Sequence, residues 1–362
     1  MIAASLRAAA LALASTAALA ALPADVTSLV EQAEAALARG DAAAATQRFE
    51  AAAERAHEAG IETGIVRAAM QSGRYREALA FAAHTAGVHA DEAEGVALYA
   101  WLLSVGGQQA AAVRTLEAAR GRVDDAALLD AVSTALATPS AAPAARTQAS
   151  PPLFAPYAVG AQPPAPATVI ATGLLIDGGR RALAPAQLLA KDRPLWLRNG
   201  LGQTVQAHVE AIDAATGIAL LQLASPLPSP AAAWAASDAF PGSPAGVLQF
   251  AAGPDTPAWP RLSQGFLGQP IGEGARRRLG IDVPPTAPGG PVTDMRGHLV
   301  GIASTAADGA PTLVTVSRLR AAGFIGDAAP TAAPPQRLAP DELYERGLRL
   351  ALQVIASPRT QP

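Results

Sequence analysis

The sequence predicts a multidomain α plus β protein in which a helical N-terminal half precedes an all-β C-terminal half. The first observation is a stretch from Val26 to about Leu136 that has apolar residues at helical spacing and no proline. The second is a series of short apolar runs after Thr168, separated by glycine, proline and asparagine, as is typical of strands and turns. A segment rich in proline and alanine separates the two halves, and a length of 362 residues suits two domains.

The composition narrows the classes of function. Aromatic residues make up 4% of the chain, so we expect cores built from small, closely spaced side chains. The chain has no cysteine, which excludes disulfides and cysteine-ligated metal sites. The net charge is −3 and the one basic cluster, residues 276–278, is interpreted as a solvated loop, so we expect no nucleic-acid partner. We also expect no cofactor and no metal site.

Residues 1–24 are interpreted as a secretory signal peptide. Arg7 is followed by a run of alanine, leucine and small residues, and Ala18-Leu19-Ala20 fits the small-x-small cleavage rule. The apolar run is too short to be a confident membrane span. We therefore expect export to the periplasm of a Gram-negative bacterium and no transmembrane segment in the mature chain. The alternative is an alanine-rich first helix.

Residues 25–137 contain an internal repeat. Gly40, Gly73 and Gly106 lie 33 residues apart in each step, and each follows one apolar-periodic helix and precedes another. An alanine stands five positions after each of these glycines. This pattern predicts three helix pairs, followed by a capping helix over residues 124–136.

The unit that begins at Gly73 resembles the core of the tetratricopeptide (TPR) repeat, which has a period of about 34 residues. The tryptophan and the terminal proline of that family are missing, so a plain alanine-rich helical bundle is the alternative. The resemblance implies a concave groove that binds peptides or proteins. The candidate groove residues are Arg67, Gln71, Arg74 and Tyr75, and their alternative is an ordinary polar face.

The histidines of this half receive a structural interpretation. His57, His84 and His89 lie near predicted helix ends, where exposed histidines are common. We therefore expect them to be surface residues rather than ligands.

Residues 138–167 are rich in proline, alanine and serine and predict an extended linker. The β half follows over residues 168–325. It has a strand over residues 168–177, a hairpin whose turn is Asn199-Gly200, and later strands over residues 244–250, 263–267 and 313–317.

One loop in this half carries a resemblance to a known family. Pro288-Gly289-Gly290-Pro291 precedes a short strand, a turn over residues 294–297, and the apolar run 299–302. This resembles the active-site loop of HtrA-type serine proteases, which have the trypsin-like (chymotrypsin) fold of two β-barrels. Pro288 stands at the position of the nucleophilic serine.

Two upstream segments extend the resemblance in the expected order. Gln187 falls at the position of the catalytic histidine, and Gly217 falls at that of the catalytic aspartate. The resemblance therefore implies a degenerate triad of Gln187, Gly217 and Pro288, with every catalytic side chain replaced.

These replacements remove the chemistry of the family. Proline has neither a nucleophilic hydroxyl nor the backbone N–H that forms half of the oxyanion hole. Glutamine is no general base near neutral pH, and glycine cannot orient an imidazole. The oxyanion loop is also degenerate, since its members are Thr286, Gly289 and Gly290, with threonine in place of a glycine. We expect no peptidase activity.

A substitute triad from His208 or His298 with Asp294 and Ser304 is also considered. No spacing in the sequence assembles these residues, so structural roles are expected.

The C-terminal region predicts a second linker over residues 326–340 and an amphipathic helix over residues 341–356. This helix is expected to dock on one of the two domains, and a free partner-binding helix is the alternative.

The favoured hypothesis is an exported pseudoprotease that acts as a non-catalytic adaptor and binds a protein or peptide in the cell envelope. Two alternatives stay open. One is an active serine-type endopeptidase with an atypical site, and the other is an envelope-assembly scaffold that uses mainly the TPR-like repeats. The sequence does not specify an oligomeric state.

Overall fold

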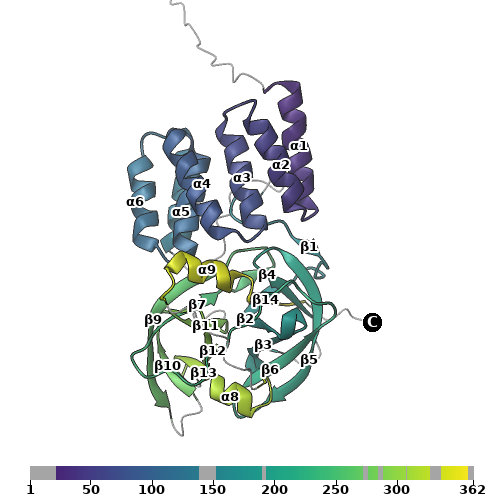
Figure 1. Ribbon diagram of the computed structural model, residues 1–362, viewed down its shortest axis with the longest axis vertical. Helices are drawn as coiled ribbons and strands as arrows, with labels where there is room; N and C mark the ends of the chain where they lie inside the picture. Colours follow the sequence, from purple (N-terminus) through teal and green to yellow (C-terminus); the bar gives the residue numbers. More distant parts are fainter. Residues whose placement is uncertain are drawn as a thin grey trace, which may run out of the picture.

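The structure is a computed structural model of the chain. It describes residues 22–137, 152–189, 193–271, 276–283, 288–306, 308–326 and 336–357. In this part of the chain, a row of antiparallel helices stands on a layer made of two β-barrels (Figure 1). None of the described helices is long and apolar enough to cross a membrane.

The helical array is built from seven of the described helices. They are α1 (Ala24–Ala38), α2 (Ala42–Ala53), α3 (Ala59–Gln71), α4 (Tyr75–Val88), α5 (Ala93–Val105), α6 (Gln109–Ala119) and α7 (Ala126–Ala137). Gly40, Gly73 and Gly107 follow the first helix of each pair with positive φ angles of 79°, 69° and 84°, a conformation that ends a helix readily only at glycine. In the third pair the left-handed residue is therefore Gly107, one position after the glycine of the sequence repeat.

Small residues let neighbouring helices approach closely. A Cβ atom on Gly64 of α3 would lie 2.3 Å from the ring of Phe49, and one on Gly106 would lie 1.9 Å from the hydroxyl of Tyr75. Both rings are fully buried. Aromatic side chains of the array therefore pack directly against glycine, where no Cβ atom separates them from the neighbouring backbone.

The first barrel (barrel 1) contains six described strands in the order β5-β4-β14-β2-β3-β6, and the pairing of β5 with β6 closes it. Their bounds are β2 (Thr168–Ile176), β3 (Arg181–Pro185), β4 (Leu195–Asn199), β5 (Gln203–Asp213), β6 (Ile218–Leu223) and β14 (Ala351–Ala356). Two short strands, β1 (Val159–Gly160) and β8 (Gly253–Pro254), pair with β5 and β2 from outside. A 3-10 turn, η1 (Asp177–Gly179), links β2 to β3.

The second barrel (barrel 2) is closed by six described strands in the order β10-β13-β12-β11-β7-β9. Their bounds are β7 (Pro244–Gln249), β9 (Arg261–Ile271), β10 (Arg276–Gly280), β11 (Pro291–Asp294), β12 (Leu299–Thr305) and β13 (Pro311–Thr315). A short helix, α8 (Val316–Ala321), follows β13. The predicted fold class, a helical array followed by a trypsin-like double β-barrel, is confirmed.

The prediction for the C-terminus is wrong in its second half. The expected helix over residues 341–356 ends at Leu348 as α9 (Pro340–Leu348), and the chain continues as β14. Strand β14 lies between β4 and β2, and all six of its residues are buried. A strand that is buried on both faces has a continuous apolar run instead of an alternating one, and such a run also fits a helical pattern.

The first linker is also more ordered than expected. Residues 138–151 lie outside the described part, but residues 152–167 are described, and Leu153 and Phe154 are buried among the helices. Strand β1 then pairs in parallel with β5. The segment is held because it fills the space between the array and barrel 1.

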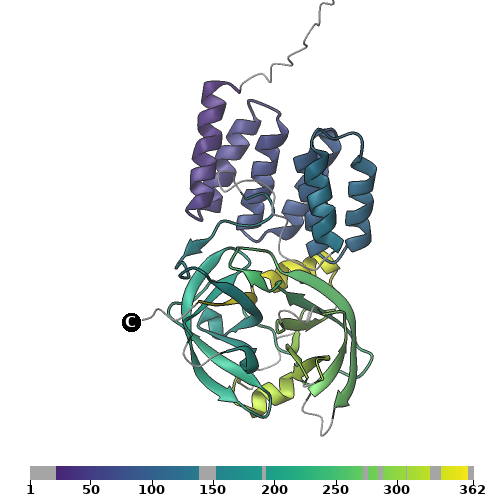
Figure 2. The same ribbon diagram turned by 180° about the vertical axis from the view of Figure 1, so that it is seen from behind.

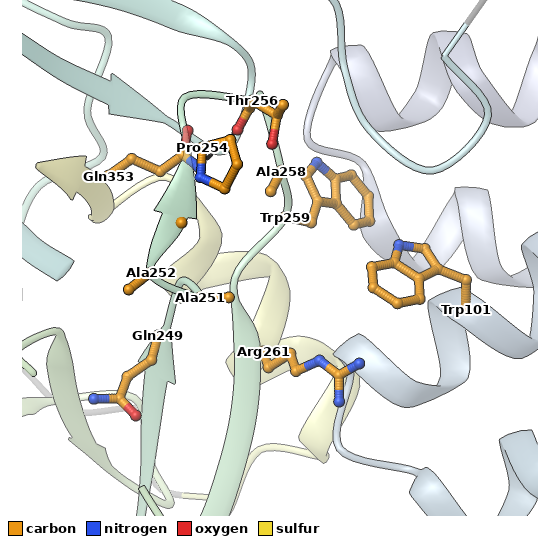
Figure 3. A pocket seen from close by; sticks show the side chains of 11 residues that line it. Trp101, Gln249, Ala251, Ala252, Pro254, Thr256, Ala258, Trp259, Arg261 and Gln353 are labelled. Atoms are coloured by element: carbon orange, nitrogen blue, oxygen red, sulfur yellow. Dashed lines mark hydrogen bonds between the residues drawn. The ribbon is translucent and has the colours of Figure 1, made fainter. Parts of the chain in front are cut away.

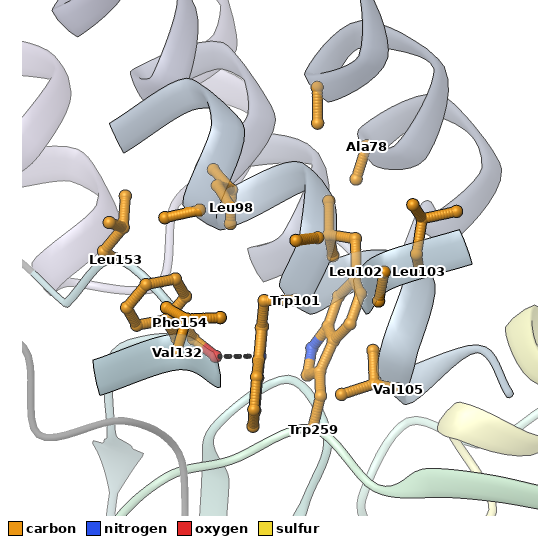
Figure 4. Packing of buried hydrophobic residues seen from close by; sticks show 14 of the residues in the cluster. Ala78, Leu98, Trp101, Leu102, Leu103, Val105, Val132, Leu153, Phe154 and Trp259 are labelled. Carbon is orange, nitrogen blue, oxygen red and sulfur yellow. Dashed lines mark hydrogen bonds between the residues drawn. The ribbon is translucent and has the colours of Figure 1, made fainter. Parts of the chain in front are cut away.

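The array and the barrels share one hydrophobic core. It combines Trp101 and Leu102 of α5 with Trp259, which precedes β9, and with Tyr344 of α9. Helix α9 lies between the helices and the barrels in both views (Figures 1 and 2). Figure 4 shows Trp259 beside Leu102, and the indole N–H of Trp101 donating to the carbonyl of Phe154 at 3.1 Å. We call this contact region the array–barrel junction.

Candidate functional site

The structure brings the three predicted triad positions to the region where the two barrels meet. Gln187 lies in η2 (Ala186–Leu188) after β3, Gly217 lies in the turn before β6, and Pro288 directly precedes the loop into β11. The backbone N–H of Ala186 donates to the carbonyl of Gly217 at 2.9 Å, and a Cβ atom on Gly289 would lie 3.0 Å from Cδ of Pro185. Segments that are distant along the chain therefore meet here, and we use the name cleft for this contact region between the barrels.

Strand β2 of barrel 1 holds the loop of barrel 2 directly. The N–H of Thr172 donates to the carbonyl of Pro288 at 3.0 Å, and Thr172 forms a parallel bridge with Gly289. The side-chain amide of Gln249 donates to the carbonyl of Gly289 at 2.9 Å, and the N–H of Ala303 donates to that of Gly290 at 2.9 Å. Each of the three carbonyls in Pro288-Gly289-Gly290 therefore accepts a hydrogen bond.

The two glycines of the loop are required by this close approach. Gly289 and Gly290 have φ angles of 110° and 101°, a region that side chains rarely adopt. A Cβ atom would lie 1.9 Å from the carbonyl oxygen of Thr172 at Gly289, and 2.2 Å from that of Leu248 at Gly290. Thr286, the third predicted member of the oxyanion loop, lies outside the described residues.

The turn that carries Gly217 is fixed by its own side chains. The carboxylate of Asp213 accepts a hydrogen bond from the N–H of Thr216 at 2.8 Å. Hydrogen bonds from Thr216 hold the pKa of Asp213 below its ordinary value. Gly217 follows with a φ of 66°, so this position is shaped for a residue without a side chain.

Arg276 is a cleft residue that the sequence analysis assigned to a solvated loop. It lies on β10, and its Nη2 donates to the carbonyl of Thr216 in barrel 1 at 2.8 Å. Its Nη1 donates to the carbonyl of Thr305 in barrel 2 at 3.3 Å. A Cβ atom on Gly217 would lie 2.7 Å from Nη2, so the guanidinium occupies the space beside the predicted aspartate position. The run of three arginines was the available signal, but it did not show which one faces barrel 1.

The substitute triad does not assemble. Nδ1 of His298 lies 3.0 Å from the carboxylate of Asp294, but that carboxylate also accepts the backbone N–H groups of Arg296 and His298, which makes the pair part of the turn. Ser304 lies five residues beyond Leu299, which starts β12 next to His298. It is therefore roughly 17 Å along the strand from the His298–Asp294 pair. His208 is exposed on β5.

Three of the four predicted groove residues contact parts of the chain outside the helical array. Arg67 forms a bidentate pair with Glu34 and donates to the carbonyl of Pro152 at 2.8 Å. The side-chain amide of Gln71 donates to the carbonyl of Leu201 at 2.7 Å and its oxygen accepts the N–H of Tyr157. Segment 152–157 therefore occupies the surface that the sequence offered as a partner groove.

The third of these residues, Tyr75, is fully buried at the array–barrel junction. Its ring lies 4.4 Å from that of Tyr344 and 5.9 Å from that of Trp259, centroid to centroid, and its hydroxyl donates to the carbonyl of Leu102. Burial raises the pKa of Tyr75 and of Tyr344 above the ordinary tyrosine value. Arg74, by contrast, stays on the surface and pairs with Glu77 at 2.7 Å.

A small pocket lies at the edge of the same junction (Figure 3). Trp101 and Trp259 form one side, and the guanidinium of Arg261 stacks 5.3 Å from the centroid of the Trp101 ring. Burial lowers the pKa of Arg261. The side of the pocket formed by Trp101, Trp259 and Arg261 belongs to the packing between array and barrel.

The sequence matches no protein-family model and no curated protein. Among solved structures, the Rv3671c protease in its inactive form is 21% identical and covers 44% of this chain and 87% of its own, with a TM-score of 0.36. The active form of the Rv3671c protease from M. tuberculosis is 20% identical, with coverages of 47% and 76% and a TM-score of 0.35. The double barrel of the present chain is established by its own strand pairings.

Proposed function

We propose that this chain is a pseudoprotease whose double barrel binds a polypeptide without cleaving it. The observation that carries the proposal is the convergence of Gln187, Gly217 and Pro288 at the cleft, each without the side chain that catalysis requires. Neither a hydroxyl nucleophile nor an imidazole base stands at these positions.

The position of Arg276 supports the same proposal. Its guanidinium fills the space in which a side chain at position 217 would have to lie. It also bridges a carbonyl of each barrel, so a hydrogen-bonded cation stands where an active site would need a carboxylate that orients histidine. The cleft is therefore organised around a different polar group.

The barrels pack closely beside this region. Ile302 and Val314 of barrel 2 share a core with Leu174 and Leu220 of barrel 1. A polypeptide would therefore bind at the exposed edge of the region, where Gln187 lies, and not between the barrels.

Activity is tested first on the purified chain. We expect neither labelling by a fluorophosphonate probe nor cleavage of casein, with an active trypsin-like protease as the positive control. Labelling that is lost when one serine is replaced would instead locate a nucleophile and establish the alternative, an active endopeptidase with an atypical site.

Binding is tested with a fluorescently labelled, unfolded polypeptide such as reduced and alkylated casein, followed by anisotropy. We expect saturable binding, and we expect Arg276→Ala to raise the Kd at least about fivefold. A hydrogen-bonded contact of this kind contributes about 1 kcal/mol to the free energy of binding. Arg278→Ala is the matched control, because Arg278 lies two residues away on β10 and pairs with Asp308 on the surface. Absence of binding, or equal effects of the two variants, would contradict a polypeptide-binding cleft.

The scaffold alternative predicts a different outcome. If the helical array alone binds the partner, Arg276→Ala has no effect and substitutions on the exposed face of the array abolish binding. Segment 152–157 already covers Arg67 and Gln71, which leaves less of the predicted groove for such a partner.

We further propose that the protein works in the periplasm, as the signal-like N-terminus indicates. Fractionation of cells that express the full chain, with N-terminal sequencing of the product, tests this. An uncleaved product in the cytoplasmic fraction would contradict it.

A further inference from the structure

We propose that the helical array holds a divalent transition-metal ion of the zinc class, bound by His57, Glu62 and His89. The proposal departs from the expectation of surface histidines and no metal site: His57 and His84 are exposed, as expected, whereas the side chain of His89 is 15% exposed. The candidate ligand atoms of the three side chains all lie within 4.8 Å of one another. Three of the five histidines in the chain, with His84 as the third, gather around one carboxylate.

The three ligands come from separate segments of the array. His57 lies in the connection between α2 and α3, Glu62 lies in the first turn of α3, and His89 caps the C-terminus of α4. The other end of α3 contacts barrel 1 through Gln71, so the site lies about 14 Å away at the far end of the helix. A bound ion would join these three segments where the barrels give no support.

The distances suit a tetrahedral ion. Nδ1 of His57 lies 3.3 Å from Oε1 of Glu62, and Nε2 of His89 lies 3.7 Å from the same oxygen. Ligands that lie 2.0–2.1 Å from a tetrahedral zinc ion are about 3.3 Å from one another. Small side-chain rotations are therefore enough to complete the geometry.

The unsatisfied polar atoms provide independent support. The side chain of Glu62 is only 5% exposed, and its Oε2 has no hydrogen-bond partner among the described residues. Nε2 of His89 is also buried and lacks a hydrogen-bond partner there. A buried carboxylate oxygen without a hydrogen-bond donor is costly, and a bound cation offsets that cost.

The orientation of the rings suits a shared ion. The rings of His57 and His89 are 5.1 Å apart, centroid to centroid, and each turns a ring nitrogen toward Oε1 of Glu62. Imidazole nitrogens and carboxylate oxygens are ligands of zinc-class ions.

His84 is placed to supply a fourth ligand. Its Nε2 lies 4.0 Å from Oε1 of Glu62, and its side chain is 52% exposed, so it has room to turn toward the ion. Four protein ligands make a closed site, which is typical of zinc in a structural role. We therefore infer that the ion clips α2, α3 and α4 together and takes no part at the cleft.

The test uses the full chain after treatment with EDTA, titrated with zinc chloride in a calorimeter. We expect one ion per chain, with an affinity that falls at least about 100-fold in His57→Ala and about 10-fold in His84→Ala. Cobalt(II) should show the intense visible absorption of a tetrahedral complex. The matched control is His208→Ala, which removes an exposed histidine of barrel 1 and should leave the affinity unchanged.

The same series of variants includes controls for correct folding. His57→Ala removes a side chain that is 62% exposed, so this variant should keep the circular dichroism of the wild type. Zinc should raise the melting temperature of the wild type and of His208→Ala but not that of Glu62→Gln. Absence of stoichiometric binding, or equal affinity in the wild type and in His57→Ala, would overturn the proposal.

Discussion

The array–barrel junction and the cleft are both places where distant segments meet, but they are built from different interactions. At the junction, Tyr75, Trp259 and Tyr344 pack ring against ring in a shared apolar core. At the cleft, the backbone N–H of Thr172 in barrel 1 donates to the carbonyl of Pro288, and the guanidinium of Arg276 donates to a carbonyl of each barrel. The junction depends on buried area, whereas the cleft depends on close backbone approach.

This difference predicts which substitutions affect stability and which affect binding. Apolar burial contributes about 25 cal/mol per Å², so a large aromatic side chain lost at the junction costs several kcal/mol. Polar contacts at the cleft are partly exchanged for contacts with water, and each contributes about 1 kcal/mol. The junction should therefore contribute most to stability, and the cleft should tolerate most changes except those at Gly217, Gly289 and Gly290.

The largest effect is expected for Tyr344→Ala. This change empties a fully buried site and removes the 2.7 Å hydrogen bond to the carbonyl of Pro260. We expect the free energy of unfolding in urea to fall by about 3–5 kcal/mol. Tyr344→Phe is the control, since it keeps the ring and should cost about 1 kcal/mol. A loss in Tyr344→Ala no greater than that in the control would contradict the role given to the junction.

The second effect is alkaline instability. Burial raises the pKa of Tyr75 and of Tyr344, and the neutral phenols are the forms that the fold favours. Their stabilisation is fully present below about pH 10, the ordinary tyrosine pKa, and is lost as the pH rises toward the folded-state values. The free energy of unfolding should fall by up to about 1.4 kcal/mol per pH unit for each tyrosine above pH 10.

The measurement is a series of urea unfolding curves between about pH 8 and 11.5, which brackets the ordinary tyrosine pKa. Tyr344→Phe should show a shallower decline above about pH 10 than the wild type, because one titrating group is gone. Parallel curves for the two proteins would show that these hydroxyls do not govern the decline.

The third effect is at the cleft backbone. Gly289→Ala places a methyl group against the carbonyl of Thr172 in a region of φ that alanine rarely adopts. We expect a loss of about 1–3 kcal/mol in the free energy of unfolding. Gly242→Ala is the matched control, since Gly242 also has a positive φ but no heavy atom lies within 4 Å of its added Cβ. Equal losses would mean that φ strain alone matters and that β2 does not press on the loop.

The smallest effect is expected for Pro288→Ser. A serine at this position still lacks a base at Gln187 and an orienting carboxylate at Gly217, so no hydrolysis of casein or of a chromogenic peptide should appear. In a triple variant that adds Gln187→His and Gly217→Asp, the new carboxylate at position 217 would lie against the guanidinium of Arg276 and not beside an imidazole alone. Detectable hydrolysis by Pro288→Ser alone would overturn the assignment of the other two positions.

Local patterns predicted much of this architecture. Helical periodicity without proline marked the array, and the Asn199-Gly200 turn between apolar runs marked the hairpin of β4 and β5. The glycines at the repeat period lie close to the helix ends, as expected, because a left-handed residue after a helix is a local requirement. These features depend only on neighbouring residues, so they can be read without knowing the fold.

The sequence by itself determined that a helical array precedes a β half, and the residue types available at each position of the cleft and the array. Only the tertiary structure decided that β14 completes barrel 1, that segment 152–157 covers Arg67, and that Arg276 reaches the cleft. The same holds for the gathering of His57 and His89 around Glu62. Each of these contacts joins segments whose separation along the chain leaves no periodic signal, because periodicity records the face on which a residue lies but not the segment packed against that face.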